Sequence, residues 1–278
     1  MSENWLSLKP MLADGAWGTE LQKLGLPPGE NPDIWNLQHP ERVAAVAKSY
    51  ADAGSRVILT NTFRANRIAM PNADIQRLNQ EGLRISREAA GDRALVFASI
   101  GPSGKLLGMG DVDEDELLEA FREQAWALCD ADALLIETMS DMAEARIALR
   151  AAKEAGAMVI VSFAFDTGRA KDRTMTGATP EMVAAEFQDA DAIGANCGMG
   201  IESAVEICGR LRAATELPLW IKPNAGLPVM VNGEVRYTQS PQAFASGVPR
   251  LLQAGATFVG GCCGTSPEFI RAAAPMFS

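Results

Sequence analysis

Eight short apolar segments alternate with longer amphipathic segments along this chain of 278 residues. The apolar segments predict β-strands, and the segments between them have the three- and four-residue apolar spacing of helices that bury one face. The predicted strands are Met11–Asp14, Arg56–Thr60, Leu95–Ile100, Ala133–Glu137, Met158–Phe163, Ala192–Asn196, Leu219–Lys222 and Thr257–Gly260. The clearest predicted helices are Pro40–Ala53, Asp115–Cys129, Asp141–Ala155 and Ile201–Ala214.

Strands that are each followed by a helix imply a parallel sheet, which is either closed into a barrel or open and doubly wound. The strand count and the unbroken alternation favour an α/β fold with a single (β/α)8 TIM barrel. Since no segment rich in Gly, Ser or Pro divides the chain, residues 1–278 are expected to form one domain. Two longer loops, Gln22–Pro32 and Asn224–Gln239, are expected at the C-terminal face, where active-site loops gather in this fold.

Local signals mark several helix ends. Asp141 is a predicted N-cap, with Glu144 at the position that would complete a capping box. Gly54, Gly156 and Gly255 each separate a predicted helix from a strand, where a left-handed residue commonly ends the helix.

The formal net charge of −10 argues against nucleic acids or anionic membranes as partners, because such a surface would repel both. No apolar segment is long enough to span a bilayer, and the first residues lack the features of a signal peptide. A cytoplasmic location is therefore expected. The five cysteines are an odd number, which in a reducing compartment indicates free thiols or metal ligands rather than a disulfide framework.

Three of these cysteines follow predicted strands. Cys197 comes directly after the sixth strand, and Cys262 and Cys263 come directly after the eighth, between glycines. In a barrel both strand ends open onto the same face, and flanking glycines let the backbone turn so that adjacent sulfurs can face one ion. Three thiolates are one ligand short of a closed structural zinc site, so the fourth position would be open to a substrate.

The alternative is that all five cysteines are small core residues, as free cysteines usually are. That interpretation is adopted for Cys129 and Cys208, which lie inside helical patterns. It is less persuasive for the other three, because an exposed vicinal pair at a strand end is an oxidation hazard without a metal.

The chain resembles the homocysteine S-methyltransferase family, which includes betaine–homocysteine methyltransferases and the homocysteine-binding module of cobalamin-dependent methionine synthase. The resemblance covers nearly the whole chain. The matching motifs are Asp14-Gly15-Ala16-Trp17-Gly18-Thr19, Thr60-Asn61-Thr62-Phe63, Leu135-Ile136-Glu137-Thr138, Gly194-Ala195-Asn196-Cys197, Pro223-Asn224-Ala225-Gly226-Leu227-Pro228 and Gly260-Gly261-Cys262-Cys263-Gly264-Thr265.

This resemblance implies a TIM barrel that transfers a methyl group to the thiol of L-homocysteine and forms methionine. It implies that Zn2+ is held by Cys197, Cys262 and Cys263. It further implies a set of substrate-binding residues: Asp14 and Glu137 for the amino group, backbone amides of Gly15 and Ala16 for the carboxylate, and Thr60 and Asn196 in the pocket.

The methyl donor has two candidate classes. One is a free onium compound such as betaine or S-methylmethionine, which aromatic side chains would hold, the candidates being Trp17, Trp35, Phe63 and Tyr237. Arg64 follows Phe63 where betaine-using members have a tyrosine, and a cation there would repel betaine unless a carboxylate pairs with it. The other class is a methylcorrinoid presented by a separate protein, which the motif around Phe63 slightly favours.

Two other functions compete with methyl transfer. Lys222 ends the seventh predicted strand, where a Schiff-base lysine could serve a lyase of the aldolase type. The family pattern instead favours Lys222 as a pocket wall or an ion-pair partner. A non-catalytic barrel that binds zinc and homocysteine is the third hypothesis.

Overall fold

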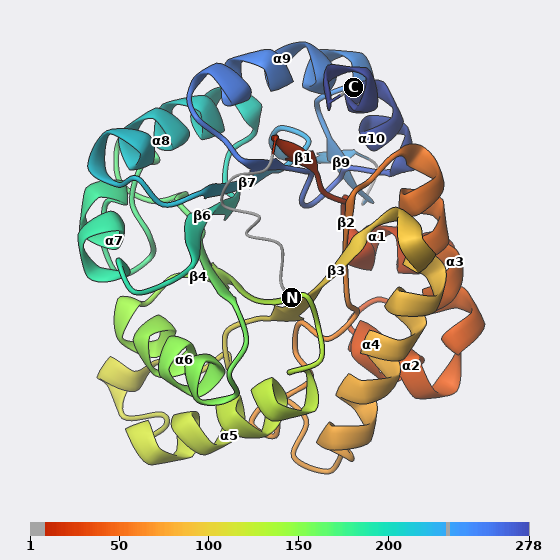
Figure 1. Ribbon diagram of the computed structural model, residues 1–278, viewed down its shortest axis with the longest axis vertical. Coiled ribbons are helices and arrows are strands. Elements are labelled where there is room, and N and C mark those ends of the chain that lie inside the picture. Colours follow the sequence, from red (N-terminus) through yellow and green to blue (C-terminus); the bar gives the residue numbers. More distant parts are fainter. Residues whose placement is uncertain (1–8, 232–233, 278) are drawn as a thin grey trace.

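Eight parallel strands form the central sheet of the computed structural model, which describes residues 9–231 and 234–277. The strands are β1 (Met11–Leu12), β2 (Val57–Leu59), β3 (Leu95–Ile100), β4 (Ala133–Met139), β5 (Val159–Phe163), β6 (Ala192–Cys197), β7 (Leu219–Pro223) and β10 (Phe258–Val259). They pair in the order β1-β10-β7-β6-β5-β4-β3-β2, and a parallel bridge between Ala13 and Val57 joins the two ends of that order. The closed (β/α)8 barrel is therefore confirmed over the doubly wound sheet (Figure 1).

The helices surround the barrel. They are α1 (Trp17–Lys23), α2 (Trp35–Gln38), α3 (Pro40–Ala53), α4 (Ile75–Ala90), α5 (Glu114–Ala127), α6 (Met142–Glu154), α7 (Pro180–Glu186), α8 (Ile201–Ala214), α9 (Pro241–Gln253) and α10 (Pro267–Ala273). Short 3-10 turns occupy Pro32–Ile34, Gly91–Arg93, Leu107–Met109 and Ala274–Phe277. Four of the helices begin at a proline, whose fixed φ suits the first helical position and whose missing N–H would have no helical partner there.

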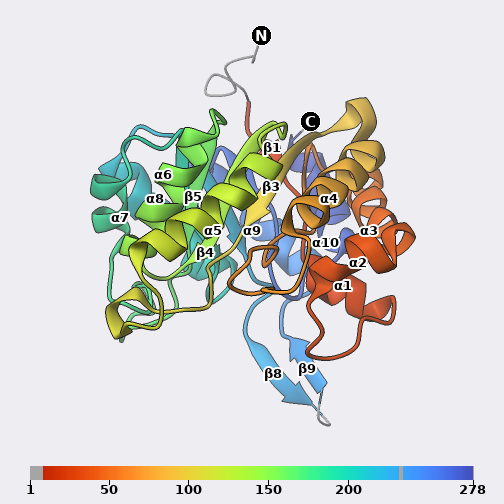
Figure 2. The same ribbon diagram turned by 90° about the horizontal axis from the view of Figure 1, so that it is seen from below.

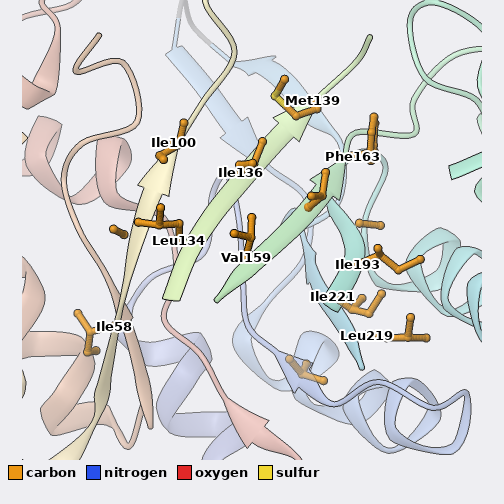
Figure 3. Close-up of a cluster of buried hydrophobic side chains, with 14 of the residues drawn as sticks. Ile58, Ile100, Leu134, Ile136, Met139, Val159, Phe163, Ile193, Leu219 and Ile221 are labelled. Carbon is orange, nitrogen blue, oxygen red and sulfur yellow. The ribbon is translucent and has the colours of Figure 1, made fainter. Parts of the chain in front are cut away.

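Side chains on each strand alternate between two apolar layers. Leu134 and Ile136 of β4 point outward into the layer between the sheet and the helices (Figure 3). Leu135 between them points into the barrel, where buried strand residues fill the interior. The rings of Phe97, Trp220 and Phe258 meet there with centroids 5.5–5.8 Å apart. The barrel is thus filled by side chains and holds its site at one end rather than in its middle.

Most predicted elements are confirmed. Pro40–Ala53 and Ile201–Ala214 match α3 and α8 residue for residue, and the left-handed glycines at 54, 156 and 255 have φ of 106°, 76° and 99°. Only one half of the predicted capping box forms. Asp141 caps α6 through the N–H of Ala143, whereas Glu144 turns inward and accepts a hydrogen bond from Ser103 N over 2.7 Å.

The second segment that was predicted to be a long loop contains regular structure. Within Asn224–Gln239, β8 (Pro228–Val231) and β9 (Glu234–Tyr237) form an antiparallel hairpin, with residues 232–233 outside the described part. The hairpin extends away from the barrel body (Figure 2). The loop prediction overlooked a hairpin signal in the sequence, Asn232-Gly233 between two short β-prone runs. Within residues 9–231 and 234–277, no helix is long and apolar enough to cross a lipid bilayer.

Candidate metal centre and substrate cavity

Three cysteine sulfurs meet at the C-terminal end of the barrel. Cys197 is the last residue of β6, and Cys262 and Cys263 lie in the loop that follows β10. The Sγ of Cys197 is 2.9 Å from that of Cys262 and 4.0 Å from that of Cys263, and all three lie within 4.8 Å of one another. The other two cysteines are elsewhere. Cys208 is buried in α8 as predicted, whereas Cys129, predicted to be a core residue within a helix, is only half-buried and lies just beyond the end of α5.

The loop after β10 is held against the end of β7 by backbone hydrogen bonds. Cys262 N donates to the oxygen of Pro223 over 2.8 Å, and the oxygen of Cys263 accepts from Ala225 N over 3.0 Å. Two neighbouring glycines make this path possible. A Cβ on Gly261 would lie 2.3 Å from the Thr265 hydroxyl, and Gly264 has a φ of 81° and abuts the Tyr237 ring. The turn that aims both vicinal sulfurs at Cys197 therefore requires glycine at these places.

The three thiols suit a soft divalent metal ion. Thiolates that share one zinc ion at ~2.3 Å lie roughly 3.8 Å apart, so the observed separations need only small adjustments. Hydrogen bonds from Cys197 and Cys262 lower the pKa of the Cys263 thiol, which favours its thiolate form. The donor set thus fits zinc with three protein ligands and one open position.

Asn196 connects this group to neighbouring strands. Its side-chain oxygen accepts hydrogen bonds from Thr138 N over 2.9 Å and from the Ser162 hydroxyl over 2.7 Å. Its nitrogen donates to the Thr138 hydroxyl over 2.6 Å and approaches Sγ of Cys197 at 3.8 Å and Sγ of Cys262 at 4.0 Å. Predicted as a substrate-binding residue, Asn196 lies beneath the sulfurs, with both ends of its amide bonded to protein atoms.

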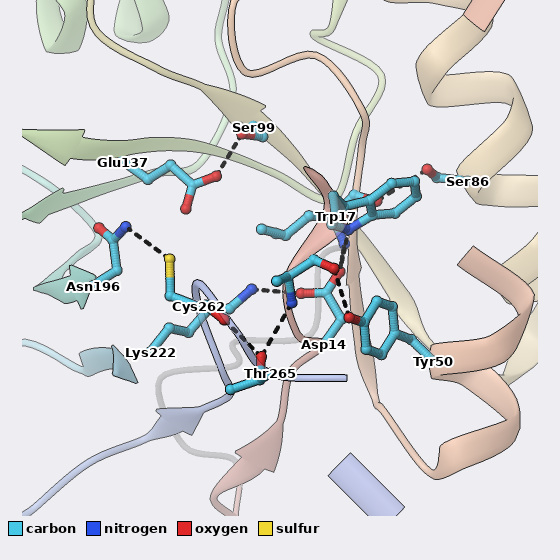
Figure 4. A network of polar contacts seen from close by, with 12 residues as sticks. Asp14, Trp17, Tyr50, Ser86, Ser99, Glu137, Asn196, Lys222, Cys262 and Thr265 are labelled. Atoms are coloured by element: carbon cyan, nitrogen blue, oxygen red, sulfur yellow. Dashed lines mark hydrogen bonds and ion pairs between the residues drawn. The ribbon is translucent and has the colours of Figure 1, made fainter. Parts of the chain in front are cut away.

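A cavity of about 900 Å³ opens beside the thiols. Its walls include Glu137, whose carboxylate accepts a hydrogen bond from the Ser99 hydroxyl over 2.5 Å (Figure 4). Burial raises the pKa of Glu137 to about 7, against an opposing effect of the nearby Lys222 ammonium. Glu137 is therefore poised to gain or lose a proton near neutral pH, and a bound cation would favour its charged form.

Asp14 is fully buried and is not among the residues that line the cavity. Its Oδ1 contacts Nζ of Lys222 at 2.5 Å, and its Oδ2 accepts from the Trp17 indole over 2.7 Å and from Leu59 N over 2.8 Å (Figure 4). Lys222 does line the cavity, although its side chain is only 3% exposed. The prediction of Lys222 as an ion-pair partner is confirmed.

The remaining predicted substrate residues surround the same cavity. Gly15, Ala16 and Thr60 all line it. Ala16 N, proposed to hold a carboxylate, already donates to the Thr265 hydroxyl over 3.2 Å. The Thr60 hydroxyl lies 2.5 Å from that of Thr62 and accepts from Ser99 N over 3.0 Å.

The aromatic candidates for donor binding separate into two groups. Trp17, Phe63 and Tyr237 line the cavity, whereas Trp35 is 2% exposed and belongs to the core, so its predicted place at the mouth is wrong. Arg64 is exposed and does not line the cavity, and its guanidinium lies toward Gly104. The cation that was expected to repel betaine therefore lies outside the cavity.

Several residues of the site were not predicted. Ser99, Thr138 and Ser162 each orient a predicted residue from a strand or strand end. Their position near the C-terminal ends of strands was the available signal. Asp33 had no such signal. It lines the cavity, is 1% exposed, accepts from Arg64 N over 2.6 Å and has a pKa raised to about 7 by burial.

Comparisons with known proteins agree with this geometry. A family model described as homocysteine S-methyltransferase matches residues 11–277. Methionine synthases of Mycobacterium tuberculosis (strain ATCC 25618 / H37Rv) and Mycobacterium leprae (strain TN) are 32% and 31% identical to this chain over 96% of its length. The chain spans about a quarter, 24%, of the length of these curated relatives.

Solved structures show the same likeness. The homocysteine methyltransferase MmuM from Escherichia coli, in its metallated form, has a TM-score of 0.78 and 26% identity, covering 97% of both chains. The carboxyl transferase domain of Rhizobium etli pyruvate carboxylase, with a TM-score of 0.56 and 16% identity over 98% of this chain and 47% of that one, shares the fold alone.

Proposed function

The chain belongs to the homocysteine S-methyltransferase family, and from that premise we propose that it transfers a methyl group to the sulfur of L-homocysteine, with zinc held by Cys197, Cys262 and Cys263. The observation that carries this proposal is the convergence of three thiols within 4.8 Å at the wall of a cavity that also presents the Glu137 carboxylate. The residues that would hold a thiol-binding metal and a group for an ammonium ion thus lie on one surface.

Zinc, when bound, would keep the acceptor sulfur as a thiolate, which is the nucleophilic form. The protein's contribution is the charge and shape around that sulfur. Three cysteine thiolates outweigh the charge of a divalent ion, so electron density stays on sulfur. Asn196 keeps Cys197 and Cys262 in place through its contacts with Thr138 and Ser162. Methyl transfer then depends mainly on positioning the donor carbon in line.

The amino-acid part of the acceptor would lie against the loop after β1. Glu137 would receive the ammonium, whereas Asp14, the second carboxylate that the resemblance assigns to the amino group, is already paired with Lys222. The carboxylate would approach the backbone at Gly15 and Ala16, which line the cavity. Thr60 would complete the wall.

The donor would enter on the far side of the cavity. A volume of about 900 Å³ leaves room beyond one amino acid, and the faces of Trp17, Phe63 and Tyr237 suit an onium cation. A methylcorrinoid carried by a separate protein is the other donor class, supported by the greater length of the methionine synthases that match this chain. Because all five cysteines are free thiols, the proposal places the protein in a reducing compartment, the cytoplasm.

A donor panel tests the proposal. Zinc-loaded protein receives homocysteine with betaine, S-methylmethionine, dimethylsulfoniopropionate or methylcobalamin, and methionine is measured. Turnover with a free onium donor supports that class, and turnover with methylcobalamin alone supports the partner class. If the protein binds zinc and homocysteine but forms no methionine with any donor, it is the non-catalytic binding barrel instead.

The lyase alternative is opposed by the state of Lys222. A Schiff-base lysine must be neutral to attack a carbonyl. Burial lowers the pKa of Lys222, but Asp14 and Glu137 outweigh that effect and raise it above the ordinary value. Borohydride trapping with a carbonyl substrate should therefore leave Lys222 unmodified, and a trapped adduct would revive this function.

A further inference from the structure

Lys222 lines the cavity and contacts the buried carboxylate of Asp14, which does not line it. We propose that Lys222 is an internal counter-ion that keeps Asp14 from binding the substrate. Of the two carboxylates, Asp14 and Glu137, Glu137 alone then binds the ammonium of the acceptor thiol, and Lys222 thereby determines the selectivity for thiols that carry an amino group. This inference rests on the proposed function and deepens it, because it concerns the acceptor subsite.

Both carboxylate oxygens of Asp14 already have protein partners. One oxygen contacts Lys222 Nζ at 2.5 Å, and the other accepts from the Trp17 indole and from Leu59 N. The side chain of Asp14 is 0% exposed. A substrate ammonium could bind this carboxylate only by displacing Lys222.

Displacing Lys222 is disfavoured by its surroundings. Its Nζ lies 5.5 Å from the centre of the Trp220 ring, a favourable cation–π placement. A Cβ on Gly260 would lie 3.1 Å from its Cε, so the chain passes close to the backbone of the neighbouring strand end. A buried ammonium also cannot leave its carboxylate without losing a charge-assisted bond that water does not replace there.

Glu137 is in a different position. It lines the cavity, and its hydrogen bond from the Ser99 hydroxyl uses only one of its two carboxylate oxygens (Figure 4). The Asp14–Lys222 pair sums to zero charge. Of the two carboxylates that the resemblance assigns to the acceptor ammonium, Asp14 and Glu137, only Glu137 therefore lines the cavity without an ion-pair partner at hydrogen-bond distance among the described residues.

The test compares binding of three thiols to the zinc-loaded protein by calorimetry. L-homocysteine carries both groups, 4-sulfanylbutanoate lacks the amino group, and 3-aminopropane-1-thiol lacks the carboxylate. Lys222→Met should release Asp14 as a second carboxylate and raise the preference for homocysteine over 4-sulfanylbutanoate by about tenfold or more. The control is Lys23→Met, since Lys23 lines the same cavity with a side chain that is 59% exposed, and its preference should stay within about twofold.

Two more variants test the same proposal if Lys222→Met does not fold. Asp14→Asn leaves Lys222 free to pair with Glu137, and it should weaken binding of 3-aminopropane-1-thiol by about tenfold while sparing 4-sulfanylbutanoate. Asp14→Asn combined with Lys222→Met removes both charges, and its preference should return to within about twofold of the unmodified protein.

Opposite outcomes overturn the inference. If Lys222→Met weakens both carboxylate-bearing thiols equally and spares the aminothiol, Lys222 binds the substrate carboxylate instead. An unchanged preference in Lys222→Met, or an altered one in the double variant, also overturns it. Failure of the unmodified protein to bind any of the thiols would instead reject the proposed function.

Discussion

The side chain of Asn196 bonds to Thr138 at two points: its oxygen accepts the Thr138 N–H over 2.9 Å, and its nitrogen donates to the Thr138 hydroxyl over 2.6 Å. This pairing joins the ends of β4 and β6, which are separated in the barrel by β5. Thr138 and Cys197 both have a φ of 60°, a conformation that non-glycine residues seldom adopt. The Asn196 bonds help to hold these strand ends in that conformation.

Replacing Asn196 by alanine should weaken both the fold and the metal centre. The change leaves Thr138 N and the Ser162 hydroxyl without their buried acceptor, which costs roughly 2–4 kcal/mol of unfolding free energy. Loss of the amide beneath the sulfurs should lower zinc affinity by about tenfold to a hundredfold. Chemical denaturation and chelator competition measure the two effects, and unchanged zinc affinity would contradict the positioning role.

The cysteine group should bind one zinc ion per chain. Cys262→Ser or Cys263→Ser removes one of three thiolate ligands, so zinc measured by elemental analysis should fall to a small fraction of that in the unmodified protein. Cys129→Ser is the matched control, because Cys129 lies outside the group and should leave zinc content unchanged. Full zinc content in all three variants would contradict the assignment.

Acceptor binding should depend on pH through Glu137. The pKa of Glu137 is raised to about 7, so its carboxylate loses charge as the pH falls below that value, and recognition of an ammonium weakens with it. Metal–thiolate bonding has a pH dependence of its own, which 4-sulfanylbutanoate shares. The ratio of the dissociation constants of 4-sulfanylbutanoate and homocysteine therefore isolates the effect of Glu137.

This ratio should favour homocysteine more at pH 8 than at pH 6, by about tenfold per pH unit at most. In Glu137→Gln the ratio should be independent of pH. A ratio that does not change with pH in the unmodified protein would show that Glu137 does not bind the ammonium.

The stability of the fold should depend on pH through Asp33. Burial raises the pKa of Asp33 from 3.8 to about 7, so the folded state holds this proton more tightly than the unfolded state. Its contribution to stability is complete below about pH 4 and is lost as the pH rises through about 7.

Asp33→Asn keeps an acceptor for Arg64 N without a charge to desolvate, and it should raise the unfolding free energy by about 2 kcal/mol at pH 8 and by much less at pH 5. Glu268→Gln, at an exposed carboxylate of the same cavity, should show no such difference. Equal effects of Asp33→Asn at both pH values would contradict the assignment.

Two glycine positions should respond in opposite directions to alanine. A Cβ on Gly194, in β6, would lie 1.8 Å from the backbone oxygen of Trp220, which the β-sheet holds in place. Gly194→Ala should therefore destabilise the protein by more than about 4 kcal/mol. Gly209 is exposed on α8 with nothing near its Cβ, so Gly209→Ala should stabilise it by about 0.5–1 kcal/mol. Thermal unfolding of both variants tests this contrast, which similar melting temperatures would refute.

The architecture could be predicted because it depends on local pattern. Apolar runs such as Leu95–Ile100, followed by helical spacing, describe strands that are buried on both sides, and β3 occupies those same residues. The hairpin of β8 and β9 does not follow that pattern, and its signal in the sequence is instead Asn232-Gly233 between two short β-prone runs. Its strands extend away from the barrel, so the register follows from backbone pairing and not from a buried face.

The cysteine group was evident from the chain alone, since Cys197, Cys262 and Cys263 follow strands whose ends share one face of any barrel. The ion-pair and hydrogen-bond partners of the acidic residues were not evident from the chain alone. Lys222 and Asp14 are 208 positions apart, and only closure of the sheet through β10 brings β7 and β1 close enough for their contact. The sequence by itself determined which ligands a metal would find. The tertiary structure decided that Asp14 pairs with Lys222 while Glu137 lines the cavity, because pairing of buried charges depends on distances that strand order does not contain.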